Sequence, residues 1–176
     1  LPEHAGLVTM RGQPITLVGQ QVKVGDTAPM FTAIGNNMNP VQFPSAFAGK
    51  VIILTTVPSL DTKVCSLETR RFNEEASKLG LAKDNVVVVT VSMDLPFAQA
   101  RWCGAEGIKN VITLSDYQNA AMGQTYGVLI KEKHLLARAV WVINQQEKVV
   151  YQQLVQEVGL EPDYDAALAA ARSCLK

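Results

Sequence analysis

Two uninterrupted apolar runs restrict the fold of this chain more than any other feature of its sequence. They are Val51–Leu54 and Val86–Val89, and the stretch 66–79 between them contains no glycine and no proline. Continuous apolar runs of strand length are typical of parallel strands that helices cover on both faces. The intervening stretch has its apolar residues on one broad side of a helical projection, as an amphipathic helix requires. The sequence therefore predicts a βαβ unit at the centre of an α/β fold.

Strands and helices alternate along most of the remaining chain. The expected strands are 31–34, 41–43, 51–57, 86–91, 111–114, 139–144 and 148–154, and the expected helices are 65–79, 97–103, 120–126 and 164–175. A β-hairpin is expected at 7–18, and the polar segment 144–148 suits a tight turn between the last two strands. We expect a single domain over residues 1–176 with a mixed central sheet flanked by helices, because a chain that is 48% hydrophobic can bury one sizeable core.

Charge and hydropathy narrow the choice of partners. The 16 Lys and Arg residues balance the 16 Asp and Glu residues without a basic cluster, which argues against nucleic-acid or membrane-surface binding as the main activity. No apolar run approaches the roughly 18 residues that span a bilayer, so we expect a soluble protein. The chain begins at Leu1 instead of Met, which we interpret as trimming, removal of a leader or an artificial boundary of the sequence. We expect a cytoplasmic location, with the periplasm as the alternative.

The cysteines and histidines are few. Cys65, Cys103 and Cys174 form no CxxC pair and are too far apart in the sequence for a disulfide framework. His4 and His134 complete no spacing that is typical of a zinc site. We therefore expect no structural metal, and we interpret the cysteines as reactive groups or as small buried residues. Cys174 is incidental in this interpretation, and the alternative is an exposed thiol that bonds between molecules.

Cys65 has the most reactive position of the three, because it follows the strand 51–57 and begins the helix 65–79. The first turn of a helix presents free backbone N–H groups and the positive end of the helix dipole, which stabilise an anion over a neutral group. A thiolate, the nucleophilic form of cysteine, is favoured there. The sequence therefore predicts that Cys65 is a nucleophile.

Thr62 and Pro58, which both precede Cys65, each have a structural and a functional interpretation. Thr62 lies three positions before Cys65, which is the spacing of a helix N-cap. Its hydroxyl is expected at the Cys65 N–H, at the sulfur, or at an oxygen of a bound ligand. Pro58 either ends the preceding strand or forms a wall that excludes water from the thiolate. The combined pattern P-x-x-x-T-x-x-C is much more specific than any of these residues alone.

The segment 58–65 carries a resemblance to a known family. Pro58, Thr62 and Cys65 match the peroxiredoxin signature, and the segment resembles that of the bacterial thiol peroxidase branch. Further stretches that resemble this branch are 70–73, 94–107, 110–115, 137–140 and 161–164. The resemblance implies a thioredoxin fold with an added N-terminal β-hairpin, a homodimer, and reduction of hydroperoxides through Cys65 without a haem, flavin or metal cofactor.

The resemblance also assigns roles to two distant residues. Arg138 matches the family's active-site arginine and would bring positive charge and planar donors to the thiolate; from the sequence alone it is only a charge before a strand. Cys103 follows a helix opened by Pro96 and precedes Gly104, a natural C-terminal cap, so we expect it at a helix end, where the dipole disfavours a thiolate. The resemblance makes Cys103 the resolving cysteine, in a disulfide with Cys65 of the same subunit that a thioredoxin-like partner reduces. The alternative is a small buried apolar residue.

Two other functions stay open on the sequence alone. A Cys/His hydrolase would also use an activated cysteine, but its base would have to be His4 or His134, and it would not require Cys103. A non-catalytic redox sensor or interaction module would use the same disulfide for signalling. Since a disulfide requires Cα atoms within roughly 7 Å, we hypothesise that the segments around Cys65 and Cys103 partly unwind in each cycle.

Overall fold

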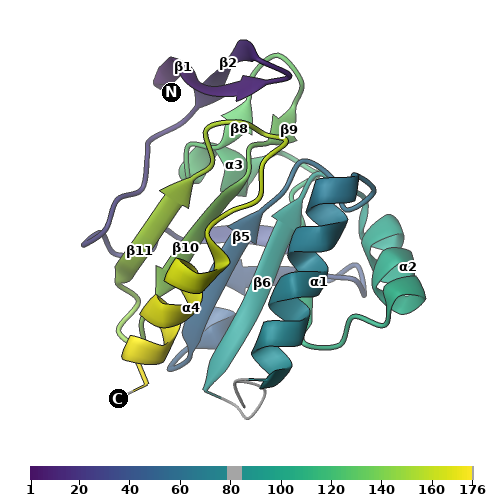
Figure 1. Cartoon of the computed structure of the whole chain (residues 1–176), viewed down its shortest axis with the longest axis vertical. Helices are drawn as coiled ribbons and strands as arrows, with labels where there is room; N and C mark the ends of the chain where they lie inside the picture. Colours follow the sequence, from purple (N-terminus) through teal and green to yellow (C-terminus); the bar gives the residue numbers. More distant parts are fainter. Residues whose placement is uncertain (79–84, 176) are drawn as a thin grey trace.

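A seven-stranded mixed sheet forms the centre of the molecule (Figure 1). The computed structural model describes residues 1–78 and 85–175, and the strand order is β11-β10-β5-β6-β7-β3-β4. These strands are β3 (Phe31–Ile34), β4 (Pro40–Phe43), β5 (Val51–Thr56), β6 (Val86–Ser92), β7 (Val111–Ser115), β10 (Ala139–Ile143) and β11 (Val149–Leu154). Strands β5, β6 and β7 run parallel and the other pairs antiparallel. The mixed sheet expected from the sequence is confirmed.

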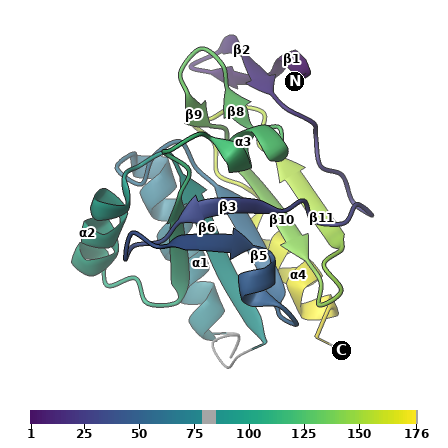
Figure 2. The ribbon, with the colours of Figure 1, turned by 180° about the vertical axis from the view of Figure 1, so that it is seen from behind.

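Helices cover both faces of this sheet. α1 (Lys63–Lys78) and α4 (Tyr164–Ser173) lie on one face (Figure 1), and α3 (Ala121–Thr125) lies on the opposite face (Figure 2). α2 (Pro96–Glu106) packs against β7 beside the start of α1, and a short 3-10 helix, Ser45–Phe47, precedes β5. No helix in the described part of the chain is long and apolar enough to cross a membrane.

The strand β5 shows why a continuous apolar run leads to this layered arrangement. Successive side chains of a strand point to opposite faces, so Ile52 and Leu54 pack in one core and Val51 and Ile53 pack in the other. All four side chains are buried. Each contributes roughly 1.5–3 kcal/mol of hydrophobic stabilisation, so the two helical layers are held to the sheet by the same strand that leads into Cys65.

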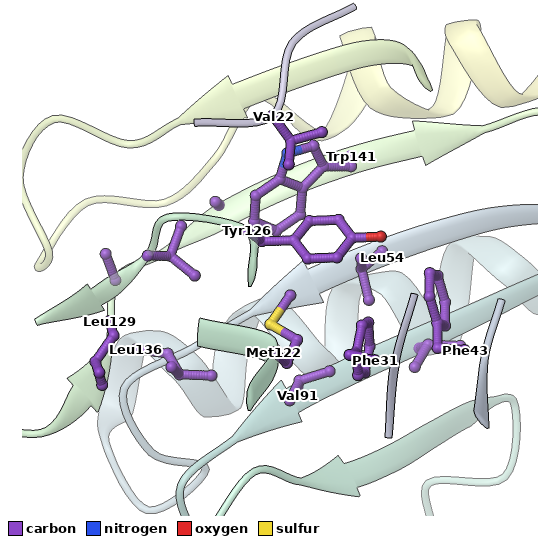
Figure 3. Packing of buried hydrophobic residues seen from close by; sticks show 14 of the residues in the cluster. Val22, Phe31, Phe43, Leu54, Val91, Met122, Tyr126, Leu129, Leu136 and Trp141 are labelled. Atoms are coloured by element: carbon purple, nitrogen blue, oxygen red, sulfur yellow. The ribbon is translucent and has the colours of Figure 1, made fainter. Parts of the chain in front are cut away.

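The larger core, on the α3 face, is rich in aromatic residues (Figure 3). Tyr126 meets Trp141 edge-on with ring centroids 5.2 Å apart, and Phe31 stacks on Phe43 at 4.7 Å. Aromatic pairs of this kind contribute about 0.5–1.5 kcal/mol beyond the area they bury. They join β3, β4 and the end of α3 to β10.

A smaller, four-stranded sheet with the order β1-β2-β8-β9 lies at one end of the molecule (Figure 1). β1 (Glu3–Met10) and β2 (Gln13–Val18) form the hairpin expected at 7–18, and the first strand starts earlier than expected. β8 (Leu129–Ile130) and β9 (Leu135–Leu136) are absent from the sequence-based assignment, because strands of two residues show no periodicity. β8 pairs with the edge of β2, and β9 pairs with β8.

The end of α2 differs from the expectation. The helix continues to Glu106, and Gly107 adopts the left-handed conformation (φ 64°) that ends it, donating its N–H to the Cys103 carbonyl. Gly104 is an interior helical residue and not the cap. An interior glycine costs only about 1 kcal/mol relative to alanine, so it does not stop a helix by itself. Cys103 therefore lies in the last turn of α2, not at its final residue.

The remaining boundaries lie within two residues of those expected. The helix expected from Cys65 starts at Lys63, so Cys65 lies inside the first turn instead of opening it. The expected last residue of that helix, Leu79, lies outside the described residues.

Candidate active site

Cys65 is the third residue of α1, and Thr62 caps this helix. The Thr62 Oγ1 accepts a hydrogen bond from the Cys65 N–H at 3.3 Å and donates one to the Ser59 carbonyl at 3.1 Å. The hydroxyl therefore satisfies one of the backbone N–H groups that a first helical turn leaves free. Of the three partners expected for Thr62, the structure shows the Cys65 N–H.

The loop between β5 and α1 is held by Asp94, which follows β6. Its carboxylate accepts hydrogen bonds from the Ser59 Oγ (2.7 Å), the Leu60 N–H (2.9 Å) and the Ser92 Oγ (2.7 Å). Pro58 is buried at the start of the same loop. Because β5 and β6 are parallel neighbours, their carboxyl ends meet at one edge of the sheet, where ligand sites of α/β folds form. A residue that follows the neighbouring strand thus fixes the chain just before Cys65.

The Cys65 side chain has an exposed fraction of 0% and packs with Leu60, and Trp102 of α2 contacts the same small cluster. A cavity of about 400 Å³ lies between the first turn of α1 and α2. Its lining includes Leu60, Thr62, Ser66 and Trp102. The sulfur therefore lies behind the wall of a cavity that is large enough for a small substrate.

Arg138 contacts the sulfur of Cys65 directly. Its side chain is buried, and Nη2 donates to the Cys65 Sγ at 3.1 Å. Arg138 immediately precedes β10, whose antiparallel pairing places Ala139 opposite Thr56, so it lies at the end of β5 where the chain leads to α1. The Val158 carbonyl accepts hydrogen bonds from Nε (3.1 Å) and Nη2 (3.0 Å) and orients the guanidinium plane. The expected nucleophile and the arginine named from the resemblance are thus in contact.

Glu68 completes this group, and the sequence-based reasoning missed it. It follows Cys65 by three residues, a spacing that puts both on one helical face, and its Oε1 accepts from Arg138 Nη1 at 3.2 Å. Burial raises the pKa of Glu68 to about 7, although the attraction and hydrogen bond of Arg138 oppose this shift. For Arg138, burial lowers the pKa, but attraction to Glu68 and Cys65 prevails and raises it. The guanidinium therefore stays charged beside the sulfur.

The raised pKa of Glu68 predicts a pH-dependent stability. A carboxyl with a pKa of about 7 in the folded protein and 4.5 as its ordinary value binds more protons when folded, so the free energy of unfolding falls as the pH rises between these values. The variant Glu68→Gln removes this titration and keeps an acceptor for Arg138. We expect the stability of the wild type relative to this variant to fall by about 1–3 kcal/mol from pH 5 to pH 8. Urea unfolding of the reduced proteins measures this difference.

The matched control is Glu74→Gln, which changes an exposed carboxyl of the same helix and should leave the pH dependence of unfolding unchanged. A stability difference between wild type and Glu68→Gln that stays constant with pH would contradict the assignment of the titration to Glu68.

Cys103 lies half-buried in α2, with its Sγ 3.7 Å from the Thr113 Oγ1 on β7. Burial raises the pKa of this thiol, and the Thr113 hydrogen bond opposes the shift. The main cause of this raised pKa is burial, whereas the sequence suggested the helix dipole. The three cysteines are free thiols. Cys103 also packs at the border of the core cluster that α1, α4 and the central sheet share, and its neighbour Trp102 contacts the Cys65 cluster as well. Cys174 donates to a backbone carbonyl one turn earlier in α4.

Comparison with known proteins identifies the family of this chain. Residues 23–168 match the Redoxin family model. The curated thiol peroxidases of Listeria innocua and Bacillus subtilis are each 50% identical to this chain, over 94% and 96% of its length and 97% and 98% of theirs. The chain therefore belongs to the Redoxin family. Within this family it falls in the thiol peroxidase branch of the peroxiredoxins, which are thiol-dependent peroxidases.

Solved structures show the same fold. A peroxiredoxin-like protein from Aquifex aeolicus is 40% identical, with a TM-score of 0.87 over 97% of this chain and 99% of that one. A thiol peroxidase from Chromobacterium violaceum is 19% identical, with a TM-score of 0.83 over 94% and 95% of the two chains. The thioredoxin fold expected from the sequence is confirmed.

Proposed function

We propose that this chain reduces hydroperoxides and that Cys65 is the peroxidatic cysteine. The contact of 3.1 Å between Arg138 Nη2 and the Cys65 Sγ carries the proposal, because a fixed guanidinium favours an anionic, nucleophilic sulfur. The thiolate attacks the distal oxygen of the peroxide, and the O–O bond breaks. Its electron pair leaves with the other oxygen, which takes up a proton and departs as water or an alcohol. The sulfur is oxidised by two electrons to a sulfenic acid.

The groups around the sulfur also serve the transition state of this step, in which negative charge moves from the sulfur to the leaving oxygen. Arg138 already donates to the sulfur and stabilises charge on both atoms. Thr62 lines the cavity beside Cys65, and we propose that its hydroxyl turns from the Ser59 carbonyl to the bound peroxide. Pro58, buried in the preceding loop, excludes water from the thiolate.

Cys103 is the proposed resolving cysteine. Its thiol attacks the sulfenic sulfur of Cys65, the S–O bond breaks, water departs and a disulfide forms. Support comes from its place in α2, directly after Trp102, which contacts the Cys65 cluster. Because the two thiols lie on different helices, the first turn of α1 and the last turn of α2 partly unwind to bring the Cα atoms within about 7 Å. A dithiol such as thioredoxin then reduces the disulfide.

The variant Cys103→Ser separates the two steps. We expect it to react once with peroxide at close to the wild-type rate, because Arg138 and Cys65 are untouched, but to lose thioredoxin-dependent turnover by at least about tenfold. Mass spectrometry of peroxide-treated protein should find the intramolecular Cys65–Cys103 disulfide in the wild type and in the control Cys174→Ser, and none in Cys103→Ser. A Cys65–Cys174 linkage in the wild type would overturn the assignment.

Steady-state kinetics test the function as a whole. A redox sensor would share the first oxidation and the disulfide, so the discriminating quantity is the number of peroxide molecules consumed per chain in the presence of thioredoxin and its reductase. Continued consumption supports the peroxidase, and a single stoichiometric burst supports the sensor. We also propose that the chain forms a homodimer, which its membership of the peroxiredoxins supports.

A further inference from the structure

The segment between β11 and α4 connects the N-terminal hairpin to the active-site arginine through one residue. The Val158 N–H donates to the Thr9 carbonyl at 2.9 Å. The carbonyl of the same residue accepts from Arg138 Nε at 3.1 Å and Nη2 at 3.0 Å. Val158 is therefore held by the hairpin through its N–H group, and its carbonyl in turn holds the guanidinium that contacts Cys65.

Glu157 attaches this segment to the hairpin. Its carboxylate accepts from the Arg11 N–H (2.9 Å), the Gly12 N–H (3.3 Å) and the Thr9 hydroxyl. Arg11 and Gly12 have positive φ values of 50° and 78°, so the turn directs both N–H groups toward one anion. The Thr9 N–H also donates to the Gln156 carbonyl at 2.8 Å, which forms a parallel bridge between β1 and the segment.

We propose that Glu157 is a positioning residue for the reaction of Cys65 with peroxide, acting through Val158 and Arg138. The inference rests on the proposed function, because it assumes that Arg138 assists that reaction. The guanidinium is oriented from two sides, by Glu68 and by the Val158 carbonyl. If the segment detaches from the hairpin, the Val158 carbonyl moves, and the Arg138 Nη2 then moves relative to the Cys65 sulfur. Displacements of about 1 Å at reacting groups slow enzymes considerably.

The hairpin offers a matched control on its other side. The carboxylate of Glu132, in the turn between β8 and β9, accepts from the Thr16 N–H at 2.9 and 3.1 Å. It is likewise an acidic side chain that binds a backbone N–H group of the hairpin. It lies in a different turn from the segment that contacts Arg138. Loss of either carboxylate loosens the hairpin, but only loss of the Glu157 carboxylate should change the position of Arg138 in the active site.

A double-mutant cycle tests the proposal. Glu157→Ala and Glu132→Ala are each introduced into the wild type and into an Arg138→Ala background, and the second-order rate of the single-turnover reaction with hydrogen peroxide is measured. We expect Glu157→Ala to slow the reaction about threefold to tenfold when Arg138 is present and not at all when Arg138 is absent. Glu132→Ala should change neither rate. Equal losses in both backgrounds, no loss in either, or the same loss with Glu132→Ala would overturn the proposal.

A second variant and a second measurement complete the test. If Glu157→Ala does not fold, Glu157→Gln, which keeps one acceptor oxygen, takes its place with a smaller expected loss. NMR hydrogen exchange of the Arg138 Nε–H should become faster in the Glu157 variant and not in the Glu132 variant, a change that a purely structural role would not produce. If Arg138→Ala alone leaves the rate unchanged, the proposed function loses its arginine; if that variant is slow and the cycle shows no coupling, only the role of Glu157 fails.

Discussion

Replacing Cys65 with serine is expected to abolish peroxide reduction, by on the order of a thousandfold or more in rate. A serine hydroxyl is not ionised at neutral pH and cannot form a sulfenic acid, so the first step has no nucleophile. The fold should persist, because serine is nearly the same size and its hydroxyl can accept the hydrogen bond that Arg138 Nη2 now donates to the sulfur. Peroxide consumption with thioredoxin and its reductase measures the loss.

Cys174→Ser is the matched control for this variant, since it removes a half-buried thiol at the C-terminal cap of α4 by the same atomic change. It should keep the wild-type rate. Substantial peroxide reduction by Cys65→Ser would show that the nucleophile is another thiol, and the proposed mechanism would fail at its first step.

Replacing Arg138 with alanine is expected to lower the second-order rate of the peroxide step on the order of a hundredfold. Removing one preorganised donor from a site of developing charge costs enzymes about 10²–10³ in rate, and here the donor contacts the nucleophile at 3.1 Å. Stopped-flow mixing of the reduced protein with a small excess of peroxide isolates this step from disulfide formation and recycling. Arg138→Lys keeps the charge without the planar fork and should give an intermediate rate.

Stability must be separated from catalysis in this experiment, because Arg138→Ala leaves Glu68 buried without its cation. Without the cation, the Glu68 carboxyl, whose pKa is already about 7, takes up a proton near neutral pH. The double variant Arg138→Ala with Glu68→Gln keeps this position neutral at every pH and should be as slow as Arg138→Ala. A wild-type rate in either variant would remove Arg138 from the reaction.

The part of the site that depends on neighbours along the chain could be predicted from the sequence. The spacing of Thr62 and Cys65 gave the cap, and the helix start followed from the strand before it and the uninterrupted residues after it. Arg138 came from the family resemblance alone, since no local pattern indicates that this arginine is buried. Glu68 carried a usable signal, its position three residues after Cys65, but the signal becomes meaningful only once a buried cation faces that side of the helix.

Other parts of the fold and the site depend on contacts between distant segments, which the sequence does not reveal. The Val158 carbonyl is a backbone group that any residue could supply, so nothing in its side chain points to Arg138. The sequence indicates only that Asp94 lies just before a helix, but in the structure its carboxylate holds the loop before Cys65. The predicted end of α2 was wrong because Gly104 and Gly107 are both plausible caps. Only Gly107 adopts the left-handed conformation that ends the helix.

The contacts that bury Cys65 also bear on how easily the enzyme is recycled. In the proposed cycle the first turn of α1 is intact in the dithiol form and partly unwound in the disulfide form. The Thr62 cap, the Arg138 contact and the packing on Leu60 therefore stabilise the dithiol form alone. Each 1.4 kcal/mol of such selective stabilisation raises the two-electron reduction potential of the disulfide by about 30 mV. The helix start that encloses the sulfur thus supplies driving force for the reductant that regenerates it.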